Sequence, residues 1–239
     1  NIESKHRAKN KMEVNFFWKG DNFSYLNRLC VITHLKVGHK PIMWLSGHRP
    51  NSDFWIDDLT GVEIRNADEI IDVSKFIQDG GNFKTASSLW RFTFLHEFGG
   101  LYCDTDALAI KKFPDDDWII SSSVPNENLS TGVIKAPPGQ QVFLNCIPKL
   151  KKVWGNVNVF TEEYLNLYGN MNCTHDYKLF YPFSWREWSF LFKDLQIPDV
   201  YSVHLYHTMI EKANLVLDKD FYKPSTMLGK IIERFDNGL

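Results

Sequence analysis

The chain has 239 residues, of which 44% are hydrophobic and 15% aromatic, a composition typical of a folded domain and not of a disordered segment. Its formal net charge of −2 argues against nucleic acid or an anionic membrane as the main partner, so any recognition of phosphate must be local. No run approaches the roughly 18 apolar residues of a membrane span, and the polar, basic start lacks the apolar core of a signal peptide. We expect a cytoplasmic protein by default, while a chain that does not begin with Met leaves an upstream anchor open.

Short apolar runs bounded by Gly, Pro, Asn or Asp alternate with helical stretches along the first half of the chain. This alternation predicts βαβ units around a mainly parallel sheet, hence an α/β fold. The last third is more helical, aromatic and irregular. The predicted strands are residues 14–18, 41–45, 62–65, 101–103 and 118–122, with 132–136 pairing back onto the sheet, and the predicted helices are residues 26–37 and 85–98.

Two aspartates follow a predicted strand directly. Asp104 and Asp106, at i and i+2, point to the same side of an extended backbone. The carboxyl ends of parallel strands are where ligands bind in open α/β sheets. Two carboxylates with room for water and diphosphate oxygens suit Mg²⁺ or Mn²⁺. A bare Asp-X-Asp is common, but here it follows a long amphipathic helix, Gly99-Gly100 and an apolar strand, and this context favours a metal site.

The block SSLWRFTFLHEFGGLYCDTD, residues 87–106, strongly resembles the sugar-binding segment of the Asp-X-Asp glycosyltransferases of family 32. That group is similar to the clostridial glucosylating toxins and the α-1,4-galactosyltransferases. Weaker matches are FFWKG at 16–20, VEIRNADEI at 62–70, FYPFSW at 180–185 and VHLYH at 203–207, the last in place of a His-Leu-Trp-Asn signature.

The resemblance implies a GT-A fold, with a Rossmann-like sheet flanked by helices in a single domain over residues 1–239. We expect a polar extension at 1–12, a nucleotide-sugar half at about 13–122 and an acceptor half at about 123–239. The implied reaction is metal-dependent transfer from a nucleotide-diphosphate sugar, with a UDP-sugar favoured, to a hydroxyl group of a glycan. Family precedent favours retention of the anomeric configuration.

The resemblance also assigns roles to residues. Phe17 and Trp18 would face the nucleotide base, although core packing is the competing interpretation, and Arg91 would bind donor phosphate or sugar hydroxyls. His204 would complete a metal site with Asp104 and Asp106, and His207 is a secondary residue near the diphosphate. The catalytic assignment comprises Asp104, Asp106 and Arg91.

Ser88 departs from the family pattern, which has an aspartate for the hydroxyls of the transferred hexose. A serine hydroxyl reaches less far and cannot replace both carboxylate oxygens. An unusual donor sugar, such as a deoxy sugar, or binding through water is the hypothesis that follows.

The acceptor is expected near a polar loop, for which a plain surface turn is an equal interpretation. Two other functions remain open: a glycoside hydrolase with Asp104 and Asp106 as acid and base, and a non-catalytic carbohydrate-binding protein. A P-loop phosphotransferase is disfavoured because the G-x-x-x-x-G-K-[ST] motif is absent. The expected acceptor residues are Asn126, Glu127, Asn128 and Thr131.

Overall fold

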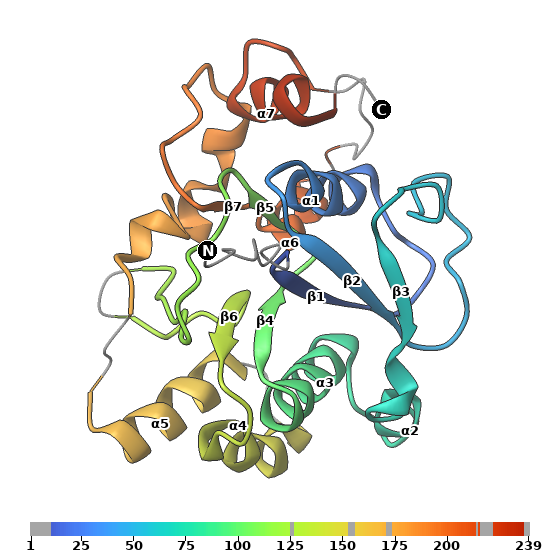
Figure 1. The fold of residues 1–239 in the computed structure, drawn as a ribbon, viewed down its shortest axis with the longest axis vertical. Coiled ribbons are helices and arrows are strands. Elements are labelled where there is room, and N and C mark those ends of the chain that lie inside the picture. The colour runs from blue at the N-terminus through green and yellow to red at the C-terminus, as the bar shows by residue number, and fades with distance from the viewer. Residues whose placement is uncertain are drawn as a thin grey trace, which may run out of the picture.

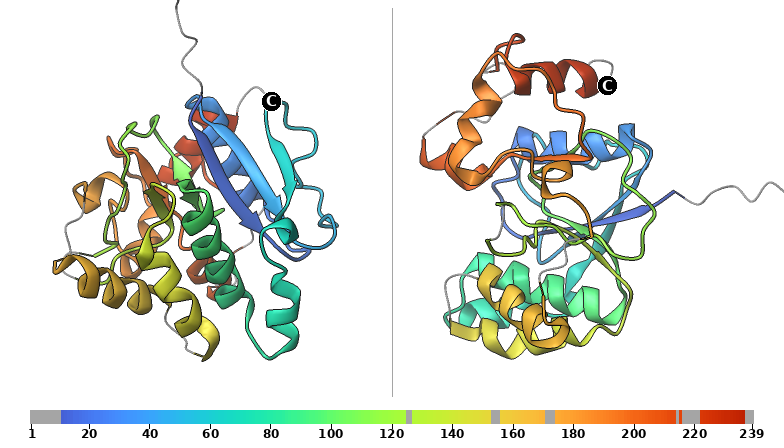
Figure 2. Two further views of the ribbon diagram at one scale, coloured as in Figure 1. Left: turned by 60° about the horizontal axis from the view of Figure 1, so that its bottom comes forward. Right: turned by 90° about the vertical axis from the view of Figure 1, so that its left-hand side faces the viewer.

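The computed structural model describes residues 11–124, 127–152, 156–170, 174–213, 215 and 222–236. A central sheet is covered on both faces by helices (Figures 1 and 2). The five strands of this sheet lie in the order β3-β2-β1-β4-β6, and β5 pairs with β7 in a second, small sheet. The strands are β1 (Glu13–Trp18), β2 (Lys40–Leu45), β3 (Glu63–Asn66), β4 (Gly100–Cys103), β5 (Ala107–Ala109), β6 (Val133–Ala136) and β7 (Ser202–His204).

Helices α2 to α5 gather on one side of the main sheet, whereas α1, α6 and α7 lie on the other (Figure 1). The α-helices are α1 (Tyr25–Lys36), α2 (Val73–Gln78), α3 (Phe83–Glu97), α4 (Gln141–Cys146), α5 (Asn156–Tyr168), α6 (His207–Lys212) and α7 (Met227–Asp236). The 3-10 helices are η1 (Ala67–Glu69), η2 (Ile147–Lys152), η3 (Tyr177–Leu179) and η4 (Trp185–Phe192).

The pairing confirms a mainly parallel α/β sheet. Strands β3, β2, β1 and β4 pair in parallel, and β6 adds an antiparallel edge to β4. The strand expected over residues 118–122 does not form, because Ile119 and Ser122 make only isolated bridges. The helical and irregular character of the last third is confirmed by short α- and 3-10 helices.

Strand β1 divides the core between the two faces of the sheet. Phe16 is fully buried on the α1 side, where its ring meets His34 edge-on. Phe17 points to the α3 side, where its ring stacks on Trp90 with centroids 5.1 Å apart. Successive side chains of a strand alternate between faces, so one apolar run serves both layers. Because both faces are apolar, β1 is fixed at the centre of the sheet, where its carboxyl end opens beside that of β4.

Gly99 connects α3 to β4 in a space that admits no side chain. Its φ is +64°, and a Cβ there would lie 2.5 Å from Pro138 N and 2.8 Å from Ala136 O. Only glycine combines that conformation with such close backbone contact. After this turn β4 pairs with β6, and the Asp-X-Asp segment that follows β4 therefore lies at the carboxyl edge of the sheet.

The small sheet brings the last third of the chain to this edge. Ala107 of β5 pairs with His204 of β7, and Leu205 N donates to Asp106 O at 2.8 Å. This pairing places the VHLYH segment directly beside the aspartates.

A buried histidine pair, His34 and His39, is hydrogen-bonded to strand β5 at this edge. Phe113 N–H donates to His39 Nε2 (3.1 Å), so the neutral ring of His39 carries its proton on Nδ1. That proton is donated to His34 Nδ1 (3.0 Å), and His34 Nε2–H is donated to Ala107 O (3.1 Å). Both rings are fully buried. The hydrogen-bond chain requires both rings to be neutral, because a second proton on either one would find no acceptor.

Acidification should therefore weaken the fold. Burial lowers the pKa of His39 from 6.5 to about 4 and that of His34 well below its usual value. A lowered folded-state pKa means that the unfolded chain binds more protons below pH 6.5, so the stabilisation present above pH 6.5 is lost as the pH falls toward 4. Through His39 alone, the free energy of unfolding should drop by about 2 kcal/mol between pH 7 and pH 5.

Urea unfolding at several pH values measures this slope. His39→Gln, which removes the titrating ring, should flatten the profile, whereas His48→Gln at an exposed site should keep it. Equal slopes in the wild type and His39→Gln would contradict the assignment.

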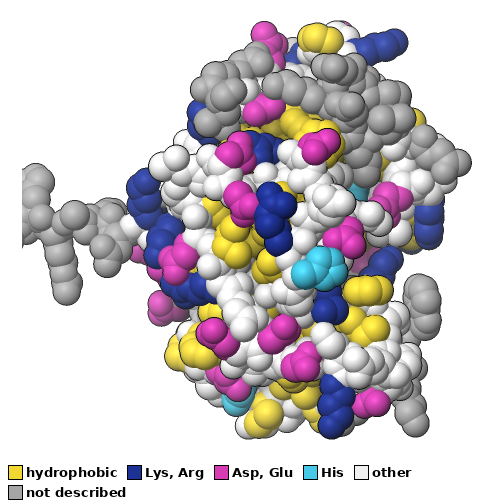
Figure 3. Space-filling model, turned by 90° about the vertical axis from the view of Figure 1, so that its right-hand side faces the viewer, with side chains coloured by type: hydrophobic (Ala, Val, Ile, Leu, Met, Phe, Trp, Pro, Cys, Tyr) yellow, Lys and Arg dark blue, Asp and Glu magenta, His cyan; other side chains and the backbone are white. Residues whose placement is uncertain are grey.

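No helix within the described residues is long and apolar enough to cross a membrane. Acidic and basic side chains are interspersed on the face shown in Figure 3, which agrees with the net charge of −2.

Candidate functional site

A cavity of about 730 Å³ opens at the carboxyl ends of β1 and β4. Its walls come from both halves of the chain, since α3 and the β4–β5 loop face the segment from β7 to α6. Most of the residues expected in the site line this one cavity. They are Phe17, Trp18, Ser88, Arg91, Asp104, Asp106, Thr131, His204 and His207.

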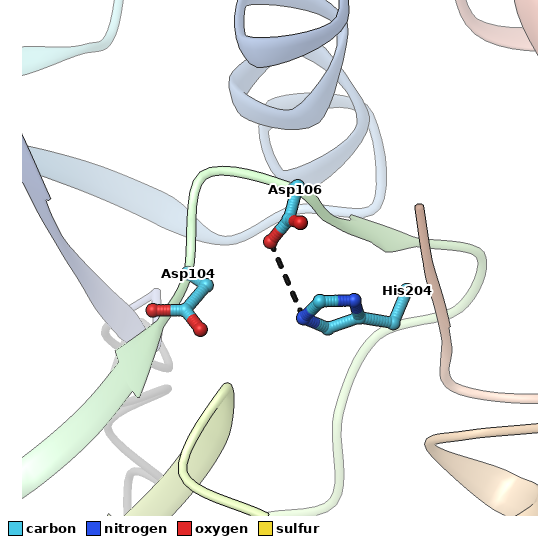
Figure 4. A group of neighbouring side chains, drawn as sticks. All are labelled: Asp104, Asp106 and His204. Atoms are coloured by element: carbon cyan, nitrogen blue, oxygen red, sulfur yellow. Dashed lines mark ion pairs between the residues drawn. The ribbon is translucent and has the colours of Figure 1, made fainter. Parts of the chain in front are cut away.

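Asp104, Asp106 and His204 converge within the cavity. One ligand atom from each lies within 4.8 Å of the other two, and His204 Nε2 is 3.2 Å from Asp106 Oδ1. Figure 4 shows the two carboxylates and the imidazole turned toward a common space, with Asp104 directly after β4 and His204 on the opposite segment. Two carboxylates and one imidazole are a donor set that suits a divalent cation such as Mn²⁺.

Hydrogen bonds determine which oxygens remain for a metal. Arg91 donates to Asp104 Oδ1, as does Tyr102 O–H at 2.9 Å. The backbone N–H of His207 donates to Asp106 Oδ2 at 3.0 Å. The remaining Asp104 Oδ2 and Asp106 Oδ1 are then available beside His204 Nε2. Such outer partners orient the ligands of metal sites.

Gly132 leaves room at this point. An ideal Cβ on Gly132 would lie 2.9 Å from His204 Nε2 and 3.1 Å from both Asp104 Oδ2 and Tyr181 O–H. The missing side chain thus leaves a space bounded by two of the three atoms that are available to a cation and by the buried hydroxyl of Tyr181. The residues fit a metal ion.

The tautomer of His204 distinguishes two states of the site. Tyr206 N–H donates to His204 Nδ1 at 3.2 Å, from a Tyr206 backbone in the left-handed region (φ +53°). With Nδ1 accepting, the neutral ring carries its proton on Nε2, where it reaches Asp106. A cation at Nε2 requires the other tautomer, so metal binding and the Tyr206 hydrogen bond exclude each other.

Arg91 crosses the cavity floor from α3. Besides Asp104 it donates to Thr131 Oγ1 and to Tyr102 O–H (3.2 Å), and its guanidinium lies 4.4 Å from the Tyr102 ring centroid. Burial acts to lower the pKa of Arg91, but Asp104, Tyr102 and Tyr181 together raise it and leave the pKa above its usual value. Burial raises the pKa of Asp104, against the opposing effect of Arg91.

One N–H group of Arg91 has no hydrogen-bond acceptor among the described residues. This group is the buried Nε–H. Buried donors are nearly always satisfied, so an orphaned one beside a cavity indicates a ligand group or water that binds there.

Helix α1 holds the Asp-X-Asp loop from the other side. Asn27 closes a capping box with Ser24 at the start of the helix and donates from Nδ2 to Thr105 O at 3.1 Å. Ser24 Oγ also lies 3.4 Å from His207 Nε2. The residue between the two aspartates is therefore tied to a helix N-terminus, which fixes the direction of both carboxylates.

The base-facing residues differ in exposure. Phe17 lines the cavity but is buried against Trp90, whereas Trp18 is partly exposed and donates from Nε1 to Gly20 O at 2.8 Å. Lys19, which follows them, donates from Nζ to Ser46 Oγ (3.2 Å) and Ser74 Oγ (3.0 Å).

Ser88 lies on the cavity wall in α3. Its hydroxyl donates to Lys84 O at 3.2 Å, one helical turn earlier. This bond holds the serine oxygen close to its own helix.

The expected acceptor residues separate in space. Thr131 lines the cavity, whereas Glu127 and Asn128 are not among the lining residues, and Asn126 lies outside the described part of the chain. Glu127 accepts from Arg186 at 3.2 Å. Arg186 in turn lies against the ring of Trp185, which lines the cavity.

The sequence analysis gave no role to several residues in or beside the cavity. Tyr102 stood within the recognised block, but only the fold shows its hydroxyl between Arg91 and Asp104. Gly132 and Tyr181 carry no local signal, because their importance comes from contacts across the sheet. The FYPFSW resemblance pointed to the segment of Tyr181 and Trp185 without giving either a role.

Comparisons with known proteins agree with this geometry. Residues 41–125 match the family described as the glycosyltransferase sugar-binding region containing DXD motif. No curated protein matches the chain. Among solved structures, the chain is similar to the PaToxG glycosyltransferase, with 16% identity, a TM-score of 0.52, and 66% of this chain and 69% of that one covered.

It is also similar to the apo-form glycosyltransferase GlyE of Streptococcus pneumoniae TIGR4, with 11% identity and a TM-score of 0.51. That match covers 82% of this chain and 54% of the other, so the chain spans about half the length of GlyE. At such identities the likeness concerns the fold, and it confirms the expected GT-A-type architecture. Residues 41–125 are thus similar to the DXD-containing sugar-binding region of the glycosyltransferases.

Proposed function

We propose that the chain transfers a sugar from a UDP-sugar to a hydroxyl group of a glycan, with Mn²⁺ or Mg²⁺ as cofactor and with retention of configuration. The observation that carries the proposal is the convergence of Asp104, Asp106 and His204 on one open point of the cavity. In this proposal residues 13–122 form the donor half of one domain and residues 123–239 the acceptor half.

Asp104 Oδ2, Asp106 Oδ1 and His204 Nε2 would hold the cation. When bound, the metal neutralises negative charge that develops on the departing diphosphate. The imidazole favours Mn²⁺ over Mg²⁺, which prefers oxygen ligands.

Other groups of the chain would bind and orient the donor. The Arg91 guanidinium anchors Asp104 and offers its unpartnered Nε to an anionic oxygen of the donor. His207, whose backbone N–H orients Asp106, lies close to the expected diphosphate. Trp18 offers an aromatic surface to the base at the far end of the cavity. A donor held at both ends would present its anomeric carbon to positioned charges and hydrogen-bond donors, which can stabilise an oxocarbenium-like state.

Lys19 supports uracil as the base. Its ammonium group has three hydrogens, of which the two serine hydroxyls accept two, and it can donate but never accept. It lies beside Trp18 and is tied to the end of β2, on the side of β1 away from the aspartates. A donor-only group there favours a base with a carbonyl edge over one with an amino edge.

Ser88 bears on the transferred sugar. Because its hydroxyl bonds to its own helix, we propose that it makes a weaker hydroxyl contact than an aspartate would, consistent with a deoxy or otherwise unusual sugar. A panel of UDP- and GDP-sugars measures this directly, and strict use of UDP-glucose or UDP-galactose would contradict it.

Calorimetric titration of UDP, GDP and CDP, with and without Mn²⁺, tests the proposal. We expect UDP to bind more tightly with Mn²⁺, by tenfold or more, and Asp106→Asn to lose this metal-dependent gain because one of three ligands is gone. Asp199→Asn, at an exposed carboxylate outside the cavity, is the matched control and should keep the gain. Absence of nucleotide binding under every condition would overturn the proposal in favour of a carbohydrate-binding protein.

A glycoside hydrolase is less compatible with the geometry. Its two carboxylates act from different positions around the scissile bond, whereas Asp104 and Asp106 converge with His204 on one point. Nucleotide-independent cleavage of a glycan would favour the hydrolase.

A further inference from the structure

Two large aromatic side chains are exposed at the cavity, whereas most of the other aromatic side chains are buried or partly buried. Phe83, at the start of α3, is 59% exposed, and Trp185, at the start of η4, is 43% exposed. Both line the same cavity as Asp104 and Asp106, from segments far apart in the sequence. Exposed aromatic rings from separate elements that meet at one cavity indicate a binding surface.

Neighbouring side chains restrain the ring of Trp185. The Arg186 guanidinium lies 4.8 Å from the Trp185 ring centroid, and Arg186 Nη1 in turn donates to Glu127 at 3.2 Å. A capping box fixes the start of η4, where Glu187 accepts from Ser184 N–H and O–H, both at 2.9 Å. A ring restrained in this way loses little conformational freedom when a ligand stacks on it.

The polar surroundings of the two rings suit a sugar. Asn82, Thr208 and Glu211 line the same cavity, and together they offer amide, hydroxyl and carboxylate groups to ligand hydroxyls. An aromatic face for C–H groups, with hydrogen-bonding groups around it, matches the two-sided chemistry of a pyranose ring. The proposed function assigns the donor diphosphate to Asp104, Asp106 and His204, which are other lining residues of the cavity.

We propose that Phe83 and Trp185 form the acceptor subsite and that the acceptor presents a pyranose ring to them. Arg186 and Glu127 are positioning residues that act through Trp185. The inference rests on the proposed function, because it places the acceptor opposite a nucleotide-sugar donor.

Saturation-transfer NMR with methyl glycosides of glucose, galactose and N-acetylglucosamine, in the presence of UDP and Mn²⁺, tests the subsite. Wild-type protein should bind at least one glycoside, and Trp185→Ala and Phe83→Ala should each weaken its affinity by about tenfold, as expected for the loss of an aromatic contact. Arg186→Gln and Glu127→Gln should weaken it by less, about threefold, because the ring remains. Trp185→Phe should restore part of the affinity.

Phe98→Ala is the matched control. Phe98 lies just past the other end of α3, is 58% exposed and does not line the cavity, so its loss should leave glycoside affinity unchanged. UDP affinity, measured in parallel, distinguishes a failure of the proposed function from a failure of the acceptor subsite. If the wild-type protein does not bind UDP, the proposed function is overturned. Normal UDP binding without saturation transfer to any glycoside overturns the acceptor subsite, and so does equal glycoside affinity in Trp185→Ala and the wild type. Transfer to protein hydroxyls alone would contradict a pyranose acceptor.

Discussion

Gly132→Ala should abolish most of the metal affinity while leaving the fold intact. The new methyl group would lie 2.9 Å from His204 Nε2 and 3.1 Å from Asp104 Oδ2, in the space that we assign to the cation. Neither side chain can withdraw freely, because Asp104 is bonded to Arg91 and Tyr102, and His204 to Asp106. The backbone itself needs no special conformation at Gly132, so the effect is confined to the site.

We expect Mn²⁺ affinity in the presence of UDP to fall by about 10- to 100-fold, the range seen when the surroundings of metal ligands are disturbed. Calorimetry with Mn²⁺ measures the affinity, and thermal unfolding without metal should show a midpoint within a few degrees of the wild type. Wild-type metal affinity in a folded Gly132→Ala protein would mean that the cation binds elsewhere.

Arg91→Met should damage both stability and transfer. The substitution leaves Asp104 in its largely buried position without the guanidinium, and Tyr102 and Thr131 lose the same partner. Breaking one side of a buried ion pair costs about 3–5 kcal/mol. Loss of a positioned donor for the anionic leaving group reduces the rate by about 10²- to 10³-fold.

Arg28→Met provides the comparison. Arg28 also makes a two-pronged ion pair, with Asp58 at 2.7 Å for both contacts, but Asp58 is exposed. The pair with the exposed Asp58 should contribute less than about 1 kcal/mol, and the hydrogen bond from Arg28 to Trp55 O (2.8 Å) about 1 kcal/mol more. Turnover should be unchanged. Urea unfolding and the rate of UDP release from the donor measure the two effects. Similar losses of stability in the two variants, or wild-type turnover by Arg91→Met, would contradict the role given to Arg91.

Local patterns in the sequence predicted the first half of the fold well. The run from Thr85 to the Gly99-Gly100 pair predicts a helix, a stop and a strand in the right order, because periodicity and glycine conformation are local properties. The strands around Val14 and Pro41 are short apolar runs with clear boundaries, and they too form where expected.

Long-range features were less accessible. The segment from Trp118 is apolar enough for a strand, yet only Ile119 and Ser122 find partners, since neighbouring backbone decides whether a run becomes a strand. The small sheet of β5 and β7 depends on the pairing of Ala107 with His204, which no local pattern announces.

In the site, too, the residues that follow from local sequence patterns were predicted better than those that depend on long-range contacts. Asp104, Asp106 and Arg91 lie on consecutive elements, so their joint position at one sheet edge follows from topology. His204 came only from a family resemblance. Gly132 shows why the rest could not be read: its contribution is the absence of a side chain at a spot defined by three residues from other segments.

The hydrogen bond between His207 N–H and Asp106 also bears on how the enzyme is made. These two residues are 101 positions apart, and in the folded protein the pairing of β7 with β5 places their segments side by side. During synthesis the sheet strands and both aspartates leave the ribosome long before His204 does. A nascent or C-terminally shortened chain can therefore carry the complete DXD segment yet lack His204, so the proposed metal site would be complete only after the end of the chain has folded back.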